Sequence, residues 1–212
     1  MKRRRMLVEL AVAGALVAIA WVLIDVGAAK LQKIDLEEQK DTEWETKFDA
    51  AKAAMAAQDF QTAECGFHSL IDYTRREFGS NAPRLADCHF ALGGVHFLTG
   101  RNNQARVEFE RSLELQEQDA NTQPQDLVPV LRRLSEVCNE LGDFQIAEKY
   151  AMRDLEIRER FHGKDSLELK QPLINLTVAL EGQKRTEAAT LVRDRLEKNA
   201  DRSHFVPFVP SW

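Results

Sequence analysis

Cysteine and histidine are the side chains from which a catalytic or metal-binding site would have to be built in this chain of 212 residues. His89 and His96 are seven residues apart, which is too far for the i, i+4 histidine pair that binds zinc on a helix. Cys88 directly precedes His89, but adjacent residues of a helix point about 100° apart and do not face each other. The spacing therefore predicts neither a nucleophile with its base nor a zinc site.

The cysteines also fail to form a disulfide framework. Cys65, Cys88 and Cys138 are odd in number and show no C-x-x-C spacing, so we expect three buried thiols. An enzyme that uses Cys138 or His96 is the catalytic alternative, and an alanine substitution at each would test it.

Phosphate and nucleic-acid chemistry lack their usual residues as well. The phosphate-binding pattern G-x-x-x-x-G-K-[ST] is absent, and Gly93 and Gly94 fall within a predicted helix. From Lys30 onward the chain has 25 basic and 32 acidic residues, a net charge of about −7 that argues against a nucleic-acid partner. We expect no enzyme, no cofactor and no bound metal.

Behind these residues lies an internal repeat with a period of 42, which begins near residue 45. One column of the repeat is alanine throughout, at Ala63, Ala105, Ala147 and Ala189. A second column is opened by Ala50 and continues with Leu92, Leu134 and Leu176. A fixed period of this size predicts a solenoid, in which each unit buries its apolar face against the next.

Each period divides into two amphipathic stretches, which predicts an all-α chain of about four helix hairpins. The predicted helices are 44–57 and 61–78, 84–98 and 104–118, 127–141 and 145–162, and 167–180 and 187–199. Gly and Asp stop one helix and begin the next at Gln58-Asp59, Gly100-Arg101, Gly142-Asp143 and Gly182-Gln183. The predicted repeats are 44–83, 84–126, 127–166 and 167–200.

These units resemble tetratricopeptide repeats (TPRs), because they combine a small alanine early in the second helix, a Leu92-Gly93 pair and a Gly-Asp-Phe turn at Gly142. The unit is longer than the usual ~34 residues, and with the sequence from Leu155 to Asp165 it is most similar to the long repeats of kinesin light chains. The resemblance covers about residues 45–199 and weakens in the fourth unit. There Gly182 is two residues out of register and Arg193 replaces a bulky residue, so this unit is expected to be a polar cap.

The resemblance implies that the first helix of each hairpin lines an inner wall that binds another protein. Residues spaced i, i+4, i+7 on those helices, with Arg133 beside them, give the groove candidates Phe48, Lys52, Met55, Phe90, Gly94, Phe97, Arg132, Arg133, Glu136, Asn139, Ile174 and Val178. The first half is aromatic and the third unit offers arginines for a carboxylate. We expect an apolar or aromatic partner peptide that carries an acidic group. The same aromatic residues could instead pack only against neighbouring helices.

The N-terminal segment predicts a membrane anchor. Residues 1–5 are basic, and 6–29 are apolar except for Glu9 and Asp25 near the two ends. About 20 such residues cross the ~30 Å hydrocarbon layer, and the basic start should stay cytoplasmic with the repeats on the other face. The alternative is a cleaved secretory signal, which would release the repeats as a secreted or periplasmic protein.

Two further segments flank the repeats. Residues 30–43 are rich in Glu, Gln, Lys and Asp and predict a solvated helical stalk. Residues 201–212 form an apolar tail in which Phe205, Phe208 and Trp212 are candidates for docking in the chain's own groove, on a partner or at the membrane surface.

The sequence therefore favours a membrane-anchored, non-catalytic TPR scaffold whose groove binds an extended or helical segment of a partner. The alternative function is an accessory or assembly subunit of a membrane enzyme or export complex, with the anchor helix packed on other transmembrane helices through Gly14 and the surrounding alanines.

Overall fold

The computed structural model describes residues 30, 32–80 and 83–202 of the chain. It divides into two compact units, Met1–Thr46 and Lys47–Trp212. In the smaller unit residues 32–46 are helical, and Ile34 and Leu36 lie exposed on this segment. The sequence predicts a stalk over residues 30–43 of this unit, and residues 44–46 belong to the predicted first repeat helix.

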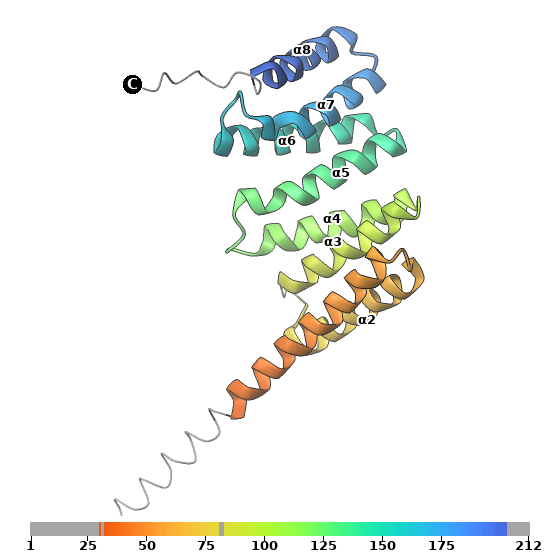
Figure 1. Cartoon of the computed structure of the whole chain (residues 1–212), viewed down its shortest axis with the longest axis vertical. Coiled ribbons are helices and arrows are strands. Elements are labelled where there is room, and N and C mark those ends of the chain that lie inside the picture. Colours follow the sequence, from red (N-terminus) through yellow and green to blue (C-terminus); the bar gives the residue numbers. More distant parts are fainter. Residues whose placement is uncertain (1–29, 31, 81–82, 203–212) are drawn as a thin grey trace, which may run out of the picture. The chain divides into compact units, whose positions relative to one another are not determined.

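The larger unit is a series of antiparallel helix hairpins, and no strand occurs in the described residues (Figure 1). Residues 47–56 are helical and pair with α2, and the next three hairpins are α3 with α4, α5 with α6 and α7 with α8. The elements are α2 (Phe60–Phe78), α3 (Pro83–Leu98), α4 (Asn102–Gln118), η1 (Pro124–Leu127), α5 (Val128–Leu141), α6 (Phe144–His162), η2 (Leu167–Leu169), α7 (Lys170–Gly182) and α8 (Thr186–Arg202). The prediction of an all-α helical repeat solenoid is confirmed. We number the hairpins 1 to 4 and call the first helix of hairpin 1 helix 47–56.

The turn within each hairpin has the same backbone conformation in all four hairpins, although the residue at this position differs. The residues with left-handed φ are Gln58 (61°), Gly100 (73°), Gly142 (79°) and Lys184 (61°), and they are spaced 42 residues apart. As the sequence indicates, Gly182 is two residues out of register: it ends α7, and Lys184 takes the left-handed position. Gly182 has a packing role, since a Cβ at this position would collide with the Phe144 ring.

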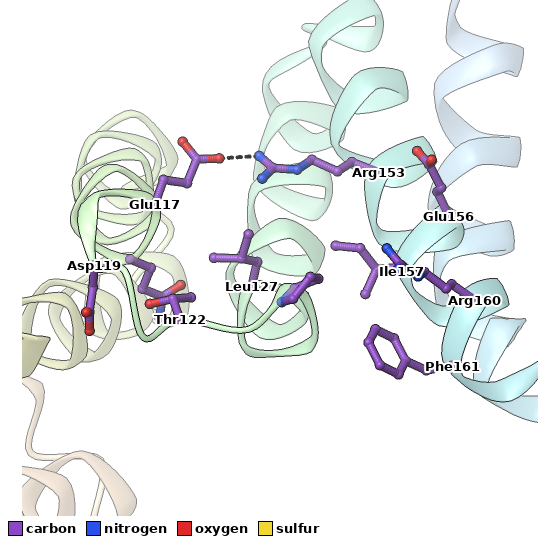
Figure 2. Close-up of a pocket in the computed structure, with 11 residues that line it drawn as sticks. Glu117, Asp119, Thr122, Leu127, Arg153, Glu156, Ile157, Arg160 and Phe161 are labelled. Atoms are coloured by element: carbon purple, nitrogen blue, oxygen red, sulfur yellow. Dashed lines mark hydrogen bonds and ion pairs between the residues drawn. The ribbon is translucent and has the colours of Figure 1, made fainter.

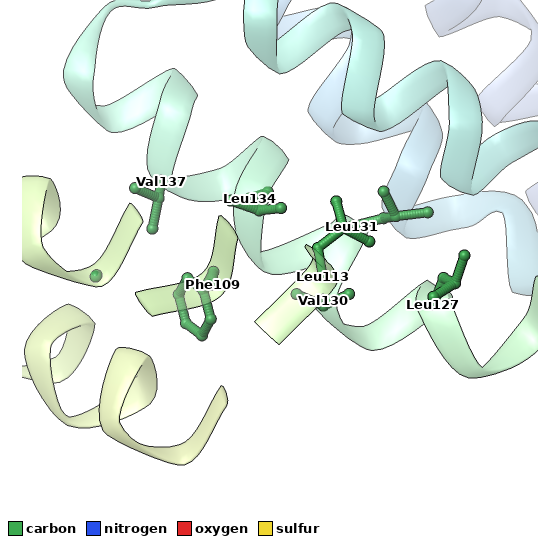
Figure 3. Close-up of a cluster of buried hydrophobic side chains, with 8 residues drawn as sticks. Phe109, Leu113, Leu127, Val130, Leu131, Leu134 and Val137 are labelled. Carbon is green, nitrogen blue, oxygen red and sulfur yellow. The ribbon is translucent and has the colours of Figure 1, made fainter. Parts of the chain in front are cut away.

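The hairpins bury the alanine column together with large apolar side chains. Ala63, Ala105, Ala147 and Ala189 are at most 2% exposed. Between α4 and α5, Phe109 packs with Leu131, Leu134 and Val137, all fully buried (Figure 3). Each such side chain contributes about 1.5–3 kcal/mol through burial, which makes this interface the centre of the core.

The leucine column holds in the second to fourth hairpins but not in the first. Leu92, Leu134 and Leu176 are buried, whereas Ala50, which was expected to open the column, is exposed. Ala51 is buried instead, and a Cβ on Gly66 would lie 3.0 Å from the Ala51 Cβ. Helix 47–56 therefore packs closely on α2 through two small residues.

Ion pairs join consecutive hairpins at one repeated place. Glu64 on α2 accepts two hydrogen bonds from Arg101, at 2.7 and 2.9 Å. Arg106 Nη1 on α4 lies 2.6 Å from Asp143 Oδ2, and Glu148 Oε1 on α6 lies 2.7 Å from Arg185 Nη1. Each pair joins residues 37 apart, and the acid and base exchange places in the middle pair. We call these three contacts the ion-pair ladder.

The connection between hairpins 2 and 3 lies beside α6, and α8 ends the series. The connection from α4 to α5 passes through η1 next to the C-terminal end of α6 (Figure 2). On α8, Arg193 occupies the repeat position of Phe67 and Phe109, is about half exposed and pairs with Glu181. Arg193 fits the polar cap expected at the end of a solenoid, although Leu191 on the same helix is 71% exposed.

Candidate functional site

One of the three cysteines is exposed, although the sequence predicts that all three are buried. Cys88 and Cys138 are buried as expected, but Cys65 is exposed on α2. Its repeat column contains Lys149, which marks an outward-facing position and could have revealed the exposure from the sequence. The expectation of three buried thiols is therefore wrong for Cys65.

The buried groups sit in surroundings that disfavour nucleophilic chemistry. Burial raises the pKa of the Cys138 thiol to about 11, so the thiolate is scarce near neutral pH. Burial lowers the pKa of His96, while His89 Nδ1 forms a 2.6 Å hydrogen bond with Glu108 Oε2. Among the described residues, no three His, Cys, Asp or Glu side chains are grouped as metal ligands would be. The hydrogen bond to Glu108 gives His89 a packing role between α3 and α4.

A mainly apolar cavity of about 320 Å³ lies along α3, between helix 47–56 and α5. We call it the apolar groove. It is lined by Phe48, Lys52, Met55, Asp87, Phe90, Ala91, Gly94, Phe97, Leu98, Phe109 and Arg133. Seven groove candidates from the sequence are among them, all from the first three hairpins.

The floor of the apolar groove is held in place by the core beneath it. The Phe90 ring lies 5.5 Å from the Phe109 ring, and the Phe48 ring lies 5.9 Å from the Phe67 ring. Gly94 leaves the middle of the floor open, because a Cβ there would meet no atom within 4 Å. The preceding glycine differs sharply, since a Cβ on Gly93 would lie 2.7 Å from the Phe109 ring. Gly93 therefore allows close packing on Phe109 in the core, and Gly94 leaves space in the apolar groove.

Two cations stand on opposite walls of the apolar groove. Lys52 Nζ lies 5.2 Å from the centre of the Phe48 ring, and Arg133 Cζ lies 5.5 Å from that of Phe97. Each cation also has an acidic neighbour, with Lys52 Nζ 3.3 Å from Asp49 and Arg133 Nη1 2.9 Å from Glu136. Both cations remain partly exposed, so they can share their charge with a ligand.

Sequence reasoning missed some lining residues, of which Asp87 and Leu98 are the most informative. Asp87 lies three residues before Phe90, one helical turn away, and Leu98 follows Phe97 and is 57% exposed. Burial raises the pKa of the Asp87 carboxyl, and Arg84 opposes this effect. Extending the selected stripe by one turn toward the N-terminus of α3 would have found Asp87, and adding the i, i+4 neighbour of Gly94 would have found Leu98.

The remaining candidates lie outside the apolar groove, in the third and fourth hairpins. They are Arg132, Glu136, Asn139, Ile174 and Val178. Asn139 Nδ2 donates a 3.0 Å hydrogen bond to the Asn175 carbonyl, and Asn175 Nδ2 donates one of 2.6 Å to Ser135 Oγ. We call Ser135, Asn139, Gln171 and Asn175 the α5–α7 joint. Asn139 serves this joint, and Arg132 lies 3.8 Å from Glu136 on its own helix.

A second cavity of about 500 Å³ lies between the end of α4, the connection to α5 and the last turns of α6 (Figure 2). An ion pair between Glu117 and Arg153 forms part of its wall. Leu127, Ile157 and Phe161 add apolar surface, and acidic and basic side chains alternate around them. This mixed lining makes it a weaker candidate than the apolar groove.

Two groups of predicted residues lie outside the described part of the chain. They are the anchor at 6–29 and the tail residues Phe205, Phe208 and Trp212. No helix within the described residues is both long enough and apolar enough to cross a membrane.

Neither a protein-family model nor a curated protein sequence matches this chain. Solved structures do match in fold. One holds the nearly identical TPR-like repeats of a protein from Podosopora anserina named as a kinesin light chain, with TM-score 0.65, 13% identity and 76% of each chain covered. Another is MamA, with TM-score 0.58, 16% identity and coverage of 76% of this chain and 81% of that one. At these identities the likeness concerns the fold, and it shows that the chain carries a TPR-like helical repeat.

Proposed function

We propose that this protein is a membrane-anchored scaffold that recruits a partner protein by binding one of its segments in the apolar groove. The observation that carries the proposal is the cavity of about 320 Å³ on the wall of the repeats, built by side chains of four helices. Repeat solenoids generally use such walls to bind other proteins rather than to catalyse reactions.

The lining of the apolar groove defines the segment that fits. Its volume equals roughly ten water molecules and is at the lower end of ligand pockets, so one or two large side chains fill it. Phe48, Phe90 and Phe97 favour an aromatic or aliphatic side chain. An acidic residue next to that side chain would pair with Lys52 or Arg133.

The anchor would decide where this recruitment happens. An apolar run such as 6–29 fits the span of a bilayer, and the basic residues before it favour a cytoplasmic N-terminus. The repeats would then act at the opposite face of the membrane and hold the partner near it.

Gly94→Leu is the sharpest test, because leucine would fill the groove without entering the core. Leucine is also a better helix former than glycine, so the fold should be retained. The full chain in detergent is used to select peptides from a phage-displayed library. We expect the wild type to enrich sequences with an aromatic or aliphatic residue beside Asp or Glu, and Gly94→Leu to lose this enrichment.

Val178→Leu provides the matched control, since Val178 is exposed on α7 outside the groove. It should select the same peptides as the wild type. Equal selection by Gly94→Leu and the wild type would show that the groove is not the binding site. Exchange of residues 6–29 for an unrelated span should preserve peptide selection, and a loss of selection would instead favour a binding role for the anchor segment.

A further inference from the structure

We propose that, when no partner is bound, the tail at residues 203–212 of a second copy of this chain occupies the apolar groove. This inference rests on the proposed function of the groove and adds its regulation. The protein would associate head to tail until a partner segment displaces the tail.

The sequence of the tail fits an aromatic-lined groove. It contains Phe-Val-Pro twice in succession, at 205–207 and 208–210, which also places Pro207 and Pro210 in P-x-x-P spacing. Proline restricts the residue before it to extended backbone, so both valines favour polyproline II. Such segments lose little entropy on binding and dock in grooves lined by aromatic rings.

The spacing of the two tail phenylalanines matches the floor of the apolar groove. Polyproline II rises about 3.1 Å per residue with three residues per turn, so Phe205 and Phe208 would share one edge about 9 Å apart. On α3, Phe90 and Phe97 are separated along the helix axis by about 10 Å. Gly94 leaves open space between these two rings. A polyproline II segment along α3 could place one phenylalanine at each end of this floor.

The reach of the chain indicates a second copy rather than the same one. α8 ends at Arg202, and α7 and α5 lie between α8 and α3 (Figure 1). Packed helices are about 8–10 Å apart, so α3 is roughly 24–30 Å from α8. The six residues from 203 to 208 extend at most about 20 Å. Phe205 and Phe208 of the same chain therefore fall short of the groove.

Charge explains how a partner would replace the tail. Residues 203–212 contain no acidic side chain, so they would use the phenyl rings of the groove but leave Lys52 and Arg133 with their present neighbours. A partner segment with an acidic residue gains the additional ion pair. The tail contact should therefore respond little to salt, whereas partner binding should weaken as salt screens the pair.

Complementation between two variants of the full chain tests the proposal. One variant has a disabled groove, Gly94→Leu, and the other a disabled tail, Phe205→Asp with Phe208→Asp. Light scattering in detergent measures the protein mass as a function of concentration. All chains share the same anchor, so any association through residues 6–29 is equal among them.

We expect the mass of the wild type to rise with concentration, because a head-to-tail contact leaves a free groove and a free tail at the ends. For each variant alone, the mass should not increase with concentration. An equal mixture should regain association but stop at two chains, since one intact groove meets one intact tail. Unchanged association in either variant, or no association of the mixture, would overturn the proposal.

A labelled peptide of residues 203–212, added to the tail variant of the full chain, separates the two proposals. Binding that Gly94→Leu abolishes would support the tail as the occupant. If this peptide fails to bind while the library peptides still require Gly94, the tail proposal is wrong and the proposed function stands. If Gly94→Leu weakens binding of neither the tail peptide nor the library peptides, both proposals fail.

Discussion

The first and second halves of the inner wall use the same repeat positions in opposite ways. Around α3 the wall is apolar, and Gly94 leaves space that no side chain fills. Around α5 and α7 the wall is polar, and Asn139 and Asn175 bond across from one helix to the next. A repeat position thus becomes part of a groove where its side chains are apolar and leave space, and part of a joint where polar side chains form hydrogen bonds to the next helix.

The contrast has an energetic basis. Leaving a buried amide N–H unpaired costs about 1–3 kcal/mol, and the α5–α7 joint pairs the side-chain nitrogens of Asn139 and Asn175, so it favours one position of α5 relative to α7. Apolar side chains need no hydrogen-bond partner, so an apolar wall can stay open until a ligand binds. The first half is therefore suited to binding and the second to holding the stack together.

The largest effect is expected from breaking the buried ion pair behind the polar half. Asp154 is fully buried and bonds at 2.6 Å to Arg158, so Arg158→Met should destabilise the fold by about 3 kcal/mol at neutral pH. Burial raises the pKa of Asp154 in the folded state, so its contribution to stability is present at low pH and is lost as pH rises. Chemical denaturation at several pH values should show the loss shrinking toward about pH 4. A pH-independent loss would refute this account.

The two glycines of α3 give a sharper test within the apolar half. Gly93→Ala forces a Cβ against the Phe109 ring and should cost about 1–3 kcal/mol. Gly94→Ala enters open space and should stabilise the helix by about 1 kcal/mol, which raises the melting temperature by roughly 2–4 °C. Thermal melts of the two single variants measure both. Equal shifts of the same sign would mean that the groove does not open at Gly94.

A smaller effect should follow from releasing Arg133. Glu136→Gln removes its acidic neighbour at 2.9 Å without changing the shape of the side chain. The freed arginine should bind an acidic peptide from the library about two to five times more tightly, the range of a surface ion pair. Fluorescence anisotropy with that peptide and its Asp→Asn analogue measures the difference. A gain that is as large for the neutral analogue would contradict an ion pair with Arg133.

The smallest effect is expected at the end of the polar half. Val178 is 42% exposed on α7 and lies outside the apolar groove, so Val178→Asp should change stability by less than about 0.5 kcal/mol. Peptide affinity should stay the same in the same anisotropy assay. A marked loss of affinity would extend the binding surface into the fourth hairpin.

The helices could be predicted because their signals are local. Periodic apolar residues and the Gly-Asp turns locate each hairpin to within a few residues. Ala50 was misplaced because helix 47–56 is mostly small residues, so apolar spacing does not distinguish its two faces. Lys184 was missed because a left-handed residue was expected to be glycine, whereas the hairpin imposes the conformation.

The candidate site was predictable at the apolar positions of the wall, where the side chain forms no hydrogen bond to another hairpin. Phe90, Gly94 and Phe97 follow from helical spacing once the resemblance to TPRs indicates that the first helix of each hairpin lines the wall. Asn139 could not be assigned, because its hydrogen bond joins it to a residue 36 positions away. Whether a polar wall residue forms a hydrogen bond to the next hairpin depends on how the hairpins stack. This cannot be predicted from one segment of the sequence.

The ion-pair ladder limits how this array could have grown. Because its polarity alternates, removing hairpin 2 alone would set Glu64 against Asp143, and removing hairpin 3 alone would set Arg106 against Arg185. Removing both together would bring Glu64 to Arg185 and restore an attractive pair. Adding or removing two neighbouring hairpins together would therefore keep every contact of the ion-pair ladder attractive, whereas a change of one inner hairpin would not.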